Sequence, residues 1–129
     1  MIVGRVSKRE PLISLTIRGS GGHALEVECV VDTGHTGWLT LPSQLITQLD
    51  LPWHSFGQGT LADGSVVFYD VYLAKVLWNG RVRRVRVSEL AAAPLVGMSL
   101  LRGCEFKMQT RSGGRLTITP LSNWGPQRL

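Results

Sequence analysis

The pattern of apolar and polar residues in the first fifty positions is mostly that of β-strands. Residues 12–19 (LISLTIRG) alternate apolar and polar side chains, as a strand with one buried face does. A Gly-rich turn separates them from a second apolar run at 24–32 (ALEVECVVD), and this arrangement predicts a hairpin. A third short strand is predicted at 37–42 (GWLTLP). Residues 42–51 (PSQLITQLDL) then have the apolar spacing and the Pro-Ser start of a short amphipathic helix.

Turn signals divide the rest of the chain into further strands. The Asn-Gly pair at 79–80 is the strongest short-range hairpin signal, and the Asp-Gly pair at 63–64 is close behind. The segments between residues 57 and 90 that flank these turns are rich in Val, Tyr, Phe and Leu, which predicts three successive strands. Residues 91–106 predict an apolar strand, a Gly and a short helical turn. A last hairpin is predicted through the Gly-Gly pair at 113–114.

Length and composition indicate one all-β domain over residues 1–129, with one or two short helices. The chain has 129 residues, of which 43% are hydrophobic and 18% charged, values typical of a globular protein with a single core. No apolar run reaches the roughly 18 residues of a membrane span. Residues 1–10 lack the pattern of a signal peptide. We therefore expect a soluble, cytoplasmic protein with no membrane partner.

The net charge of +5 makes nucleic-acid binding a class to consider. The densest basic run is NGRVRRVRV, in which arginines are interleaved with valines, as in a strand with one solvated face. Charged strands of this kind also discourage aggregation through sheet edges. No stacking aromatics and no recognised nucleic-acid motif accompany the run, so we expect no nucleic-acid partner. A small basic β-barrel that binds nucleic acid remains the third-ranked alternative, and its residues are Arg81, Arg83, Arg84 and Arg86.

The cysteines and histidines do not indicate a metal site or a nucleophile. Cys29 and Cys104 each lie in an apolar stretch, and we interpret them as small buried hydrophobes rather than as a disulfide. His23 and His54 lie in polar contexts that are typical of the surface. The sequence has no Cys/His cluster with metal-ligand spacing and no supported Ser-His-Asp or Cys-His set. We expect no metal and no cofactor.

The segment VECVVDTG places one carboxylate, that of Asp32, at the end of an apolar run. An ionised carboxylate beside apolar surface is costly unless it is paired or hydrogen-bonded. Two interpretations follow. Asp32 is either a turn residue that bonds its own backbone, or a catalytic group.

The surrounding residues favour the catalytic interpretation. Residues 30–42 (VVDTGHTGWLTLP) resemble the active-site loop of aspartic proteases, in which Asp-Thr-Gly follows an apolar strand. Residues 94–103 (PLVGMSLLRG) resemble the second hallmark of that family, two apolar residues followed by Gly and a short helix. Residues 60–73 (TLADGSVVFYDVYL) fall where the family has its flap hairpin. Order and spacing agree over about residues 11–120, and the size matches the single-domain, retroviral-type branch, with the bacterial retropepsin-like proteins most alike.

The resemblance implies a fold, an activity and a set of residues. The implied fold is a closed retropepsin-like β-barrel (the acid protease fold) that forms a homodimer. The implied activity is that of an aspartic endopeptidase acting on peptide or protein substrates. The implied residues are the catalytic Asp32, Thr33 and Gly34, the flap residues Ala62, Asp63, Gly64 and Ser65, and the supporting loop Leu95, Val96 and Gly97.

The chemistry explains why a second copy is expected. Peptide hydrolysis without a metal or a covalent nucleophile needs a base for the water and an acid for the leaving nitrogen, and two adjacent carboxylates that share one proton supply both. The chain has one Asp-Thr-Gly, and we interpret Asp63, which lacks the Thr and the apolar strand before it, as a turn residue. The second carboxylate must then be Asp32 of another copy across a two-fold axis. The resemblance implies the same homodimer, with Thr33 bonding across the axis and Gly34 allowing close backbone approach.

Three features leave alternatives open. His35 stands where the family usually has Ala or Ser, and it either lowers the pKa of the catalytic carboxyl or points away from it and does nothing, which we favour. Phe68 or Tyr69 either lines a substrate pocket or belongs to the core, and the core is the commoner role. The terminal segments 1–7 and 115–121 are candidates for strands that interleave between two subunits.

The main functional alternative is a catalytically inactive module of the same fold. Such a module binds extended peptides or a partner protein and does not cut them. His35 and a flap tip with a single Gly, ADGS, motivate this alternative.

Overall fold

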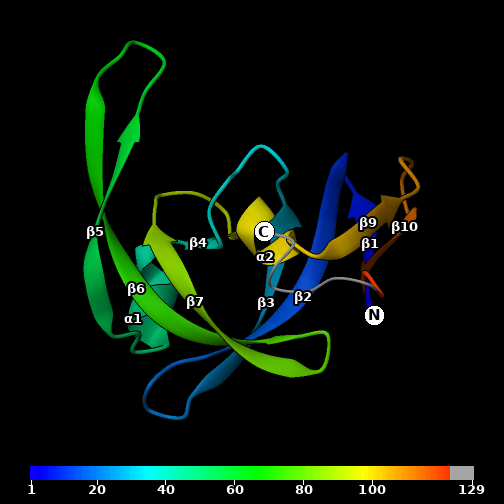
Figure 1. Ribbon diagram of the computed structural model, residues 1–129, viewed down its shortest axis with the longest axis horizontal. Coiled ribbons are helices and arrows are strands. Elements are labelled where there is room, and N and C mark those ends of the chain that lie inside the picture. The colour runs from blue at the N-terminus through cyan, green and yellow to red at the C-terminus, as the bar shows by residue number, and fades with distance from the viewer. Residues whose placement is uncertain (123–129) are drawn as a thin grey trace.

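The computed structural model describes residues 1–122, and residues 123–129, the end of the predicted domain, lie outside the described part. The described part is mostly β and includes no helix long and apolar enough to cross a membrane (Figure 1). Its strands are β1 Ile2–Ser7, β2 Glu10–Arg18, β3 Ala24–Val31, β4 Leu39–Leu41, β5 Trp53–Thr60, β6 Val66–Trp78, β7 Arg81–Glu89, β8 Leu95–Val96, β9 Cys104–Met108 and β10 Arg115–Pro120, and its helices are α1 Ser43–Gln48 and α2 Met98–Leu101.

Strands β2 and β3 form the predicted hairpin and supply much of the core. Their register pairs Ile13 with Cys29 and Leu15 with Val27, so these side chains share one face of the sheet. All four are buried. Burial raises the pKa of the Cys29 thiol to about 12, which makes it an inert small hydrophobe, as predicted. Cys104 is also a free cysteine, half-buried against the core.

The strands form one sheet in the order β5-β6-β7-β4-β8-β3-β2-β1-β10-β9. An additional antiparallel pairing joins β6 to β2 through Ile17 with Val76 and Arg18 with Lys75. This pairing folds the sheet back on itself, while β5 and β9 stand at the two ends of the strand order. We therefore describe the fold as a mostly-β sheet folded back on itself, in place of the predicted closed barrel.

The terminal strands pair with each other inside one chain. Strand β1 pairs with β10 over Ile2–Arg5 and with β2 over Arg5–Ser7. Strand β10 pairs on its other side with β9. The two terminal segments that were candidates for interleaving between subunits therefore form a three-stranded unit with β9 on one side of the body (Figure 1).

Two predicted elements are shorter than their sequence patterns. The helix predicted over 42–51 runs only from Ser43 to Gln48. Asp50 has a φ of 51°, and this left-handed conformation turns the chain out of the helix. The strand predicted at 37–42 is reduced to β4. The carbonyls of residues 37 and 38 accept hydrogen bonds from the N–H groups of Ser99 and Gly97 at the start of α2, and not from a neighbouring strand.

The hairpin of β5 and β6 projects from the body of the molecule (Figure 1). One half of β6 belongs to the core, where Val71 and Val76 are buried. The other half lies in the projecting part, where Phe68 pairs with Gln58 and is 70% exposed. The interpretation of Phe68 as a core residue is therefore wrong, because its stretch of β6 extends beyond the body.

Candidate active site

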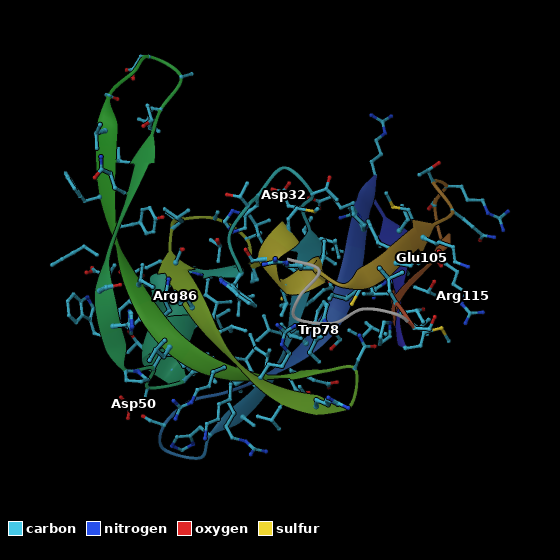
Figure 2. The ribbon with its side chains drawn as sticks, viewed as in Figure 1. Asp32, Asp50, Trp78, Arg86, Glu105 and Arg115 are labelled. Atoms are coloured by element: carbon cyan, nitrogen blue, oxygen red, sulfur yellow. The ribbon has the colours of Figure 1, made fainter. Side chains whose placement is uncertain are left out.

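Asp32 directly follows β3, at the point where β3 pairs in parallel with β8. The pairing matches Val31 with Val96, and the Asp32 N–H donates to the Val96 carbonyl at 2.9 Å. The Asp32 side chain is half-buried. Figure 2 shows Asp32 on the side of the body toward which the β5–β6 hairpin projects. The sheet thus fixes where the backbone of this residue lies, and its carboxyl group stands next to solvent.

The Asp32 carboxylate is tied to its own loop by one oxygen. The Gly34 N–H donates to Oδ1 at 2.9 Å, and the His35 N–H donates to the Asp32 carbonyl at 3.1 Å. Thr33 and Gly34 are exposed at the tip of this turn. A turn aspartate and a positioned catalytic carboxylate make the same bond, so the bond alone does not separate the two interpretations. The described residues offer no hydrogen-bond partner to Oδ2, which leaves that oxygen available to a water, a substrate or a second carboxyl group.

The loop is held from outside by the start of α2. The predicted supporting residues Leu95, Val96 and Gly97 lead into this helix beside the loop. Four hydrogen bonds run from residues 97–99 to carbonyls of residues 35–38. They are Met98 N–H to His35 (2.7 Å), Gly97 N–H to Trp38 (3.0 Å), Ser99 N–H to Gly37 (3.1 Å) and Ser99 Oγ to Thr36 (2.6 Å).

Gly97 is required by the close approach of the two segments. A Cβ at this position would lie 2.2 Å from the Gly37 carbonyl oxygen and 2.7 Å from Cδ2 of His35. Both distances are well inside van der Waals contact, and the first neighbour is backbone. The Gly of the Leu-Val-Gly motif therefore allows α2 to pack directly on the Asp32 loop.

His35 points into the fold. Its Nε2 lies 3.0 Å from Oγ1 of Thr40, which is fully buried. Its ring also packs against Gly37 and Gly97. Among the described residues its side-chain hydrogen bond is with Thr40 and not with the Asp32 carboxylate. The alternative in which His35 points away is supported, but the expectation that it does nothing is wrong, because it joins the loop to β4.

The flap tip is a tight turn closed by Asp63. The Leu61 N–H donates to the Ser65 carbonyl at 2.8 Å, and the Gly64 N–H donates to the Leu61 carbonyl at 2.9 Å. The Asp63 carboxylate accepts bonds from the hydroxyl of Ser65 (2.6 Å) and from its N–H (2.9 Å). These two bonds hold the pKa of Asp63 below its ordinary value. The hydroxyl bond lowers the pKa more than the backbone bond does. Ala62, the remaining predicted flap residue, lies exposed in the same turn.

Nearer the body, side chains stiffen the hairpin. Trp53 donates from Nε1 to Oδ1 of Asp70 at 2.9 Å and meets Phe56 edge to face, with ring centroids 5.1 Å apart. The half-buried Tyr69 ring lies against Gly57, where a Cβ would be 2.2 Å from the ring. The Gly-rich strand β5 therefore leaves room for the Tyr69 ring to lie across the hairpin.

Sequence reasoning missed Thr40 and Ser99. Both are polar residues within apolar runs, Thr40 between two leucines of β4 and Ser99 in the apolar turn of α2. Thr40 is fully buried, and because a buried polar group needs a partner, that requirement was the available signal for Thr40. The Arg83 guanidinium packs over the Trp38 ring, 5.3 Å from its centroid. This contact could not be predicted from the sequence, because the two residues lie on distant segments.

Comparisons with known proteins identify the fold. No protein-family model matches the chain, and no curated protein matches it. Among solved structures, the chain is similar to EIAV protease complexed with the inhibitor HBY-793. The match has a TM-score of 0.53 and 18% sequence identity, and it covers 74% of this chain and 88% of that chain. The chain therefore has the fold of a retroviral protease.

Proposed function

We propose that the chain is a retropepsin-like aspartic endopeptidase whose active site is completed by a second copy of the chain. The observation that carries the proposal is the Asp32-Thr33-Gly34 turn at the end of β3, braced by α2 in a chain with the retroviral-protease fold. The half-buried Asp32, whose Oδ2 has no hydrogen-bond partner among residues 1–122, supports a chemical role. A single domain over residues 1–129, the bacterial branch and a cytoplasmic location are further parts of this proposal, and they rest on the sequence.

The carboxylates near the flap already have hydrogen-bond partners, which supports an active site whose second aspartate comes from another copy. Asp63 is engaged by Ser65 in the flap turn, and Asp70 accepts the indole N–H of Trp53. The exposure of Thr33 and Gly34 supports a site shared across a two-fold axis, since the same patch must be open in each copy before the two copies meet. In such a dimer, Thr33 bonds to the partner loop and Gly34 permits the close approach of the two loops.

In the proposed reaction, the two carboxyl groups share one proton because two adjacent negative charges repel each other. The ionised Asp32 takes a proton from a water, whose oxygen attacks the carbonyl carbon of the peptide. The protonated Asp32 of the partner subunit donates its proton to the carbonyl oxygen of the substrate, which gives a tetrahedral intermediate with two hydroxyl groups. As the C–N bond breaks, the first carboxyl group passes its proton to the leaving nitrogen, and the partner's carboxylate takes a proton from one of these hydroxyl groups. Each group has then acted once as base and once as acid, and the pair again shares one proton.

The position of the β5–β6 hairpin is evidence for a peptide as the substrate. Its tip, Ala62–Ser65, projects on the Asp32 side of the body, and the substrate would lie extended beneath it. A hairpin in this position offers backbone groups to an extended peptide, as in other cases of strand addition.

The test is cleavage of a mixed peptide library between about pH 3.5 and 7, the range in which carboxyl dyads titrate. Asp32→Asn removes the proposed catalytic group with almost no change in shape. Asp50→Asn is the matched control, because it makes the same chemical change at an exposed aspartate at the other end of the body (Figure 2). We expect the wild type and Asp50→Asn to cut the library and Asp32→Asn to be inactive.

The second candidate function is a peptide-binding module that does not cut. It is favoured by the bond between Asp32 and its own loop, which a purely structural turn also makes. A wild type that binds library peptides as tightly as Asp32→Asn and releases no products supports this candidate and contradicts the peptidase. Cleavage by both the wild type and Asp32→Asn likewise contradicts the proposed mechanism.

A further inference from the structure

Three cationic side chains lie in one row across three neighbouring strands. Arg18 of β2 is paired with Lys75 of β6, and Lys75 is paired with Arg84 of β7. Residues directly opposite each other on antiparallel strands share a face of the sheet, with their Cβ atoms about 5 Å apart. Ala74 and Val76, on either side of Lys75, are buried, so the row faces away from the core.

No carboxylate of the described part of the chain forms an ion pair with this row. The ion pairs of residues 1–122 lie elsewhere, at Glu28 and at Glu105. Asp50 adjoins the loop next to Arg18, where its backbone carbonyl accepts the Ser20 hydroxyl at 3.0 Å, but its carboxylate pairs with none of the three cations. Like charges directly opposite each other on a sheet destabilise it. The row is therefore a feature that folding alone does not favour.

A pocket of about 420 Å³ opens at the row. Its volume lies in the range of small-molecule sites. Its lining includes Arg18, Lys75 and Arg84, together with Ser20 of the β2–β3 loop and the apolar residues Pro52 and Leu73.

We propose that this pocket binds a small anion that has two or three linked phosphate groups. Guanidinium groups bind phosphate through paired N–H donors, and the Lys75 ammonium between the two arginines adds a point charge. Three strands span about 10 Å at the usual spacing, so a chain of phosphates meets more of the row than a single phosphate does. The concave wall favours a compact ligand over a duplex or a long strand of nucleic acid.

The site is separate from the proposed active site. Figure 2 shows Asp50, which adjoins the pocket, and Asp32 at opposite ends of the body. Ligand binding here is therefore independent of whether the chain cleaves peptides.

The experiment titrates the full chain with inorganic triphosphate by isothermal calorimetry at about 0.15 M salt, where distant surface charges are screened. We expect wild-type binding in the micromolar range. Lys75→Gln and Arg84→Gln each remove one charge from the row and should weaken binding about tenfold. Arg111→Gln, at an exposed arginine in the β9–β10 turn, is the matched control and should bind as the wild type does.

Thermal unfolding provides a second readout. Without the anion, Lys75→Gln should melt at or above the wild-type temperature, because repulsion within the row is reduced. With triphosphate, the wild type should gain stability and Lys75→Gln should gain much less.

Absence of binding to the wild type, or equal weakening by Arg111→Gln, overturns the proposal. Binding of a single-stranded RNA oligomer in place of triphosphate also overturns it and assigns the row to nucleic acid.

Discussion

The Asp32 loop and the tip of the β5–β6 hairpin are both turns closed by an aspartate, and they are held in different ways. In both turns the carboxylate accepts the backbone N–H of the residue two positions later, at 2.9 Å. The Asp32 loop is also held by four hydrogen bonds from residues 97–99. The hydrogen bonds described at the tip join residues 61–65 only to one another.

The local motif therefore does not decide what an aspartate can do. An Asp followed by a turn occurs in both segments, but only the loop after β3 is fixed by a distant part of the chain. Segments with many exposed backbone bonds and few packed apolar contacts open at low free energy. The projecting tip, with Leu61 50% exposed, has these properties. The two turns therefore suit different tasks, a fixed carboxyl group and a movable cover.

A substitution that forces the Asp32 loop apart from α2 should destabilise the protein most. Gly97→Ala places a methyl group 2.2 Å from the Gly37 carbonyl oxygen, so the loop or α2 must move. We expect the free energy of unfolding to fall by about 3 kcal/mol, a value typical of overpacking. Denaturant unfolding measures this change, and the proposed peptidase activity should fall with it.

Gly59→Ala in the hairpin is the matched control for that substitution. Its Cβ would meet Val67 and Tyr69 at 3.7 and 3.8 Å, which is ordinary contact, so stability should stay within about 0.5 kcal/mol of the wild type. Equal destabilisation by the two substitutions would show that the loop is no more tightly constrained than the hairpin.

A smaller effect is expected from the link between the loop and β4. Thr40→Val keeps the shape of the buried side chain but removes the hydroxyl that bonds Nε2 of His35. The imidazole nitrogen then lacks a partner, which should lower the free energy of unfolding by about 1.5 kcal/mol. Thr36→Val, at an exposed position in the same loop, should cost little. A Thr40→Val protein as stable as Thr36→Val would mean that the imidazole finds another partner.

Much of the local structure could be predicted from the sequence. The alternation in residues 12–19 gave β2, and the Asn-Gly and Asp-Gly pairs marked both turns of β6. These predictions held because strand alternation and turn chemistry depend on neighbours in the chain. The turn role of Asp63 could be predicted for the same reason.

Features that depend on distant segments could not be predicted. The predicted solvated face of β7 is present, since Arg84 and Arg86 are exposed and the valines between and after them are buried, but Arg83 lies on the other face and packs over Trp38. Arg84 joins the row with Lys75 only because β6 pairs with both β7 and β2. The bond of His35 to Thr40 depends on how the loop folds over β4. Register between strands far apart in sequence decides each of these cases.

A weaker, pH-dependent effect is expected at the hairpin tip. The pKa of Asp63 is lowered in the folded chain, mainly by the Ser65 hydroxyl. A lowered pKa means that the ionised carboxylate stabilises the turn at pH values above the ordinary carboxyl pKa of about 3.9. This contribution is lost as the pH falls through the lowered pKa. We therefore expect the tip to loosen below about pH 4.

Ser65→Ala tests the tip apart from the Asp32 loop, because it removes the shortest hydrogen bond to Asp63 and leaves the Asp32 loop unchanged. The pKa of Asp63 should rise toward its ordinary value, so the tip should already be looser at neutral pH and should change less as the pH falls. NMR titration of the Asp63 carboxyl carbon and hydrogen exchange at the residue 65 amide measure both effects. Ser112→Ala, in the exposed β9–β10 turn, is the control and should leave the Asp63 titration unchanged.

An Asp63 titration that Ser65→Ala does not move would contradict the assignment of the hydroxyl as the main support of the tip. The Gly34 amide should exchange slowly in both Ser65→Ala and Ser112→Ala. That result would show that the Asp32 loop owes its greater rigidity to the hydrogen bonds from residues 97–99.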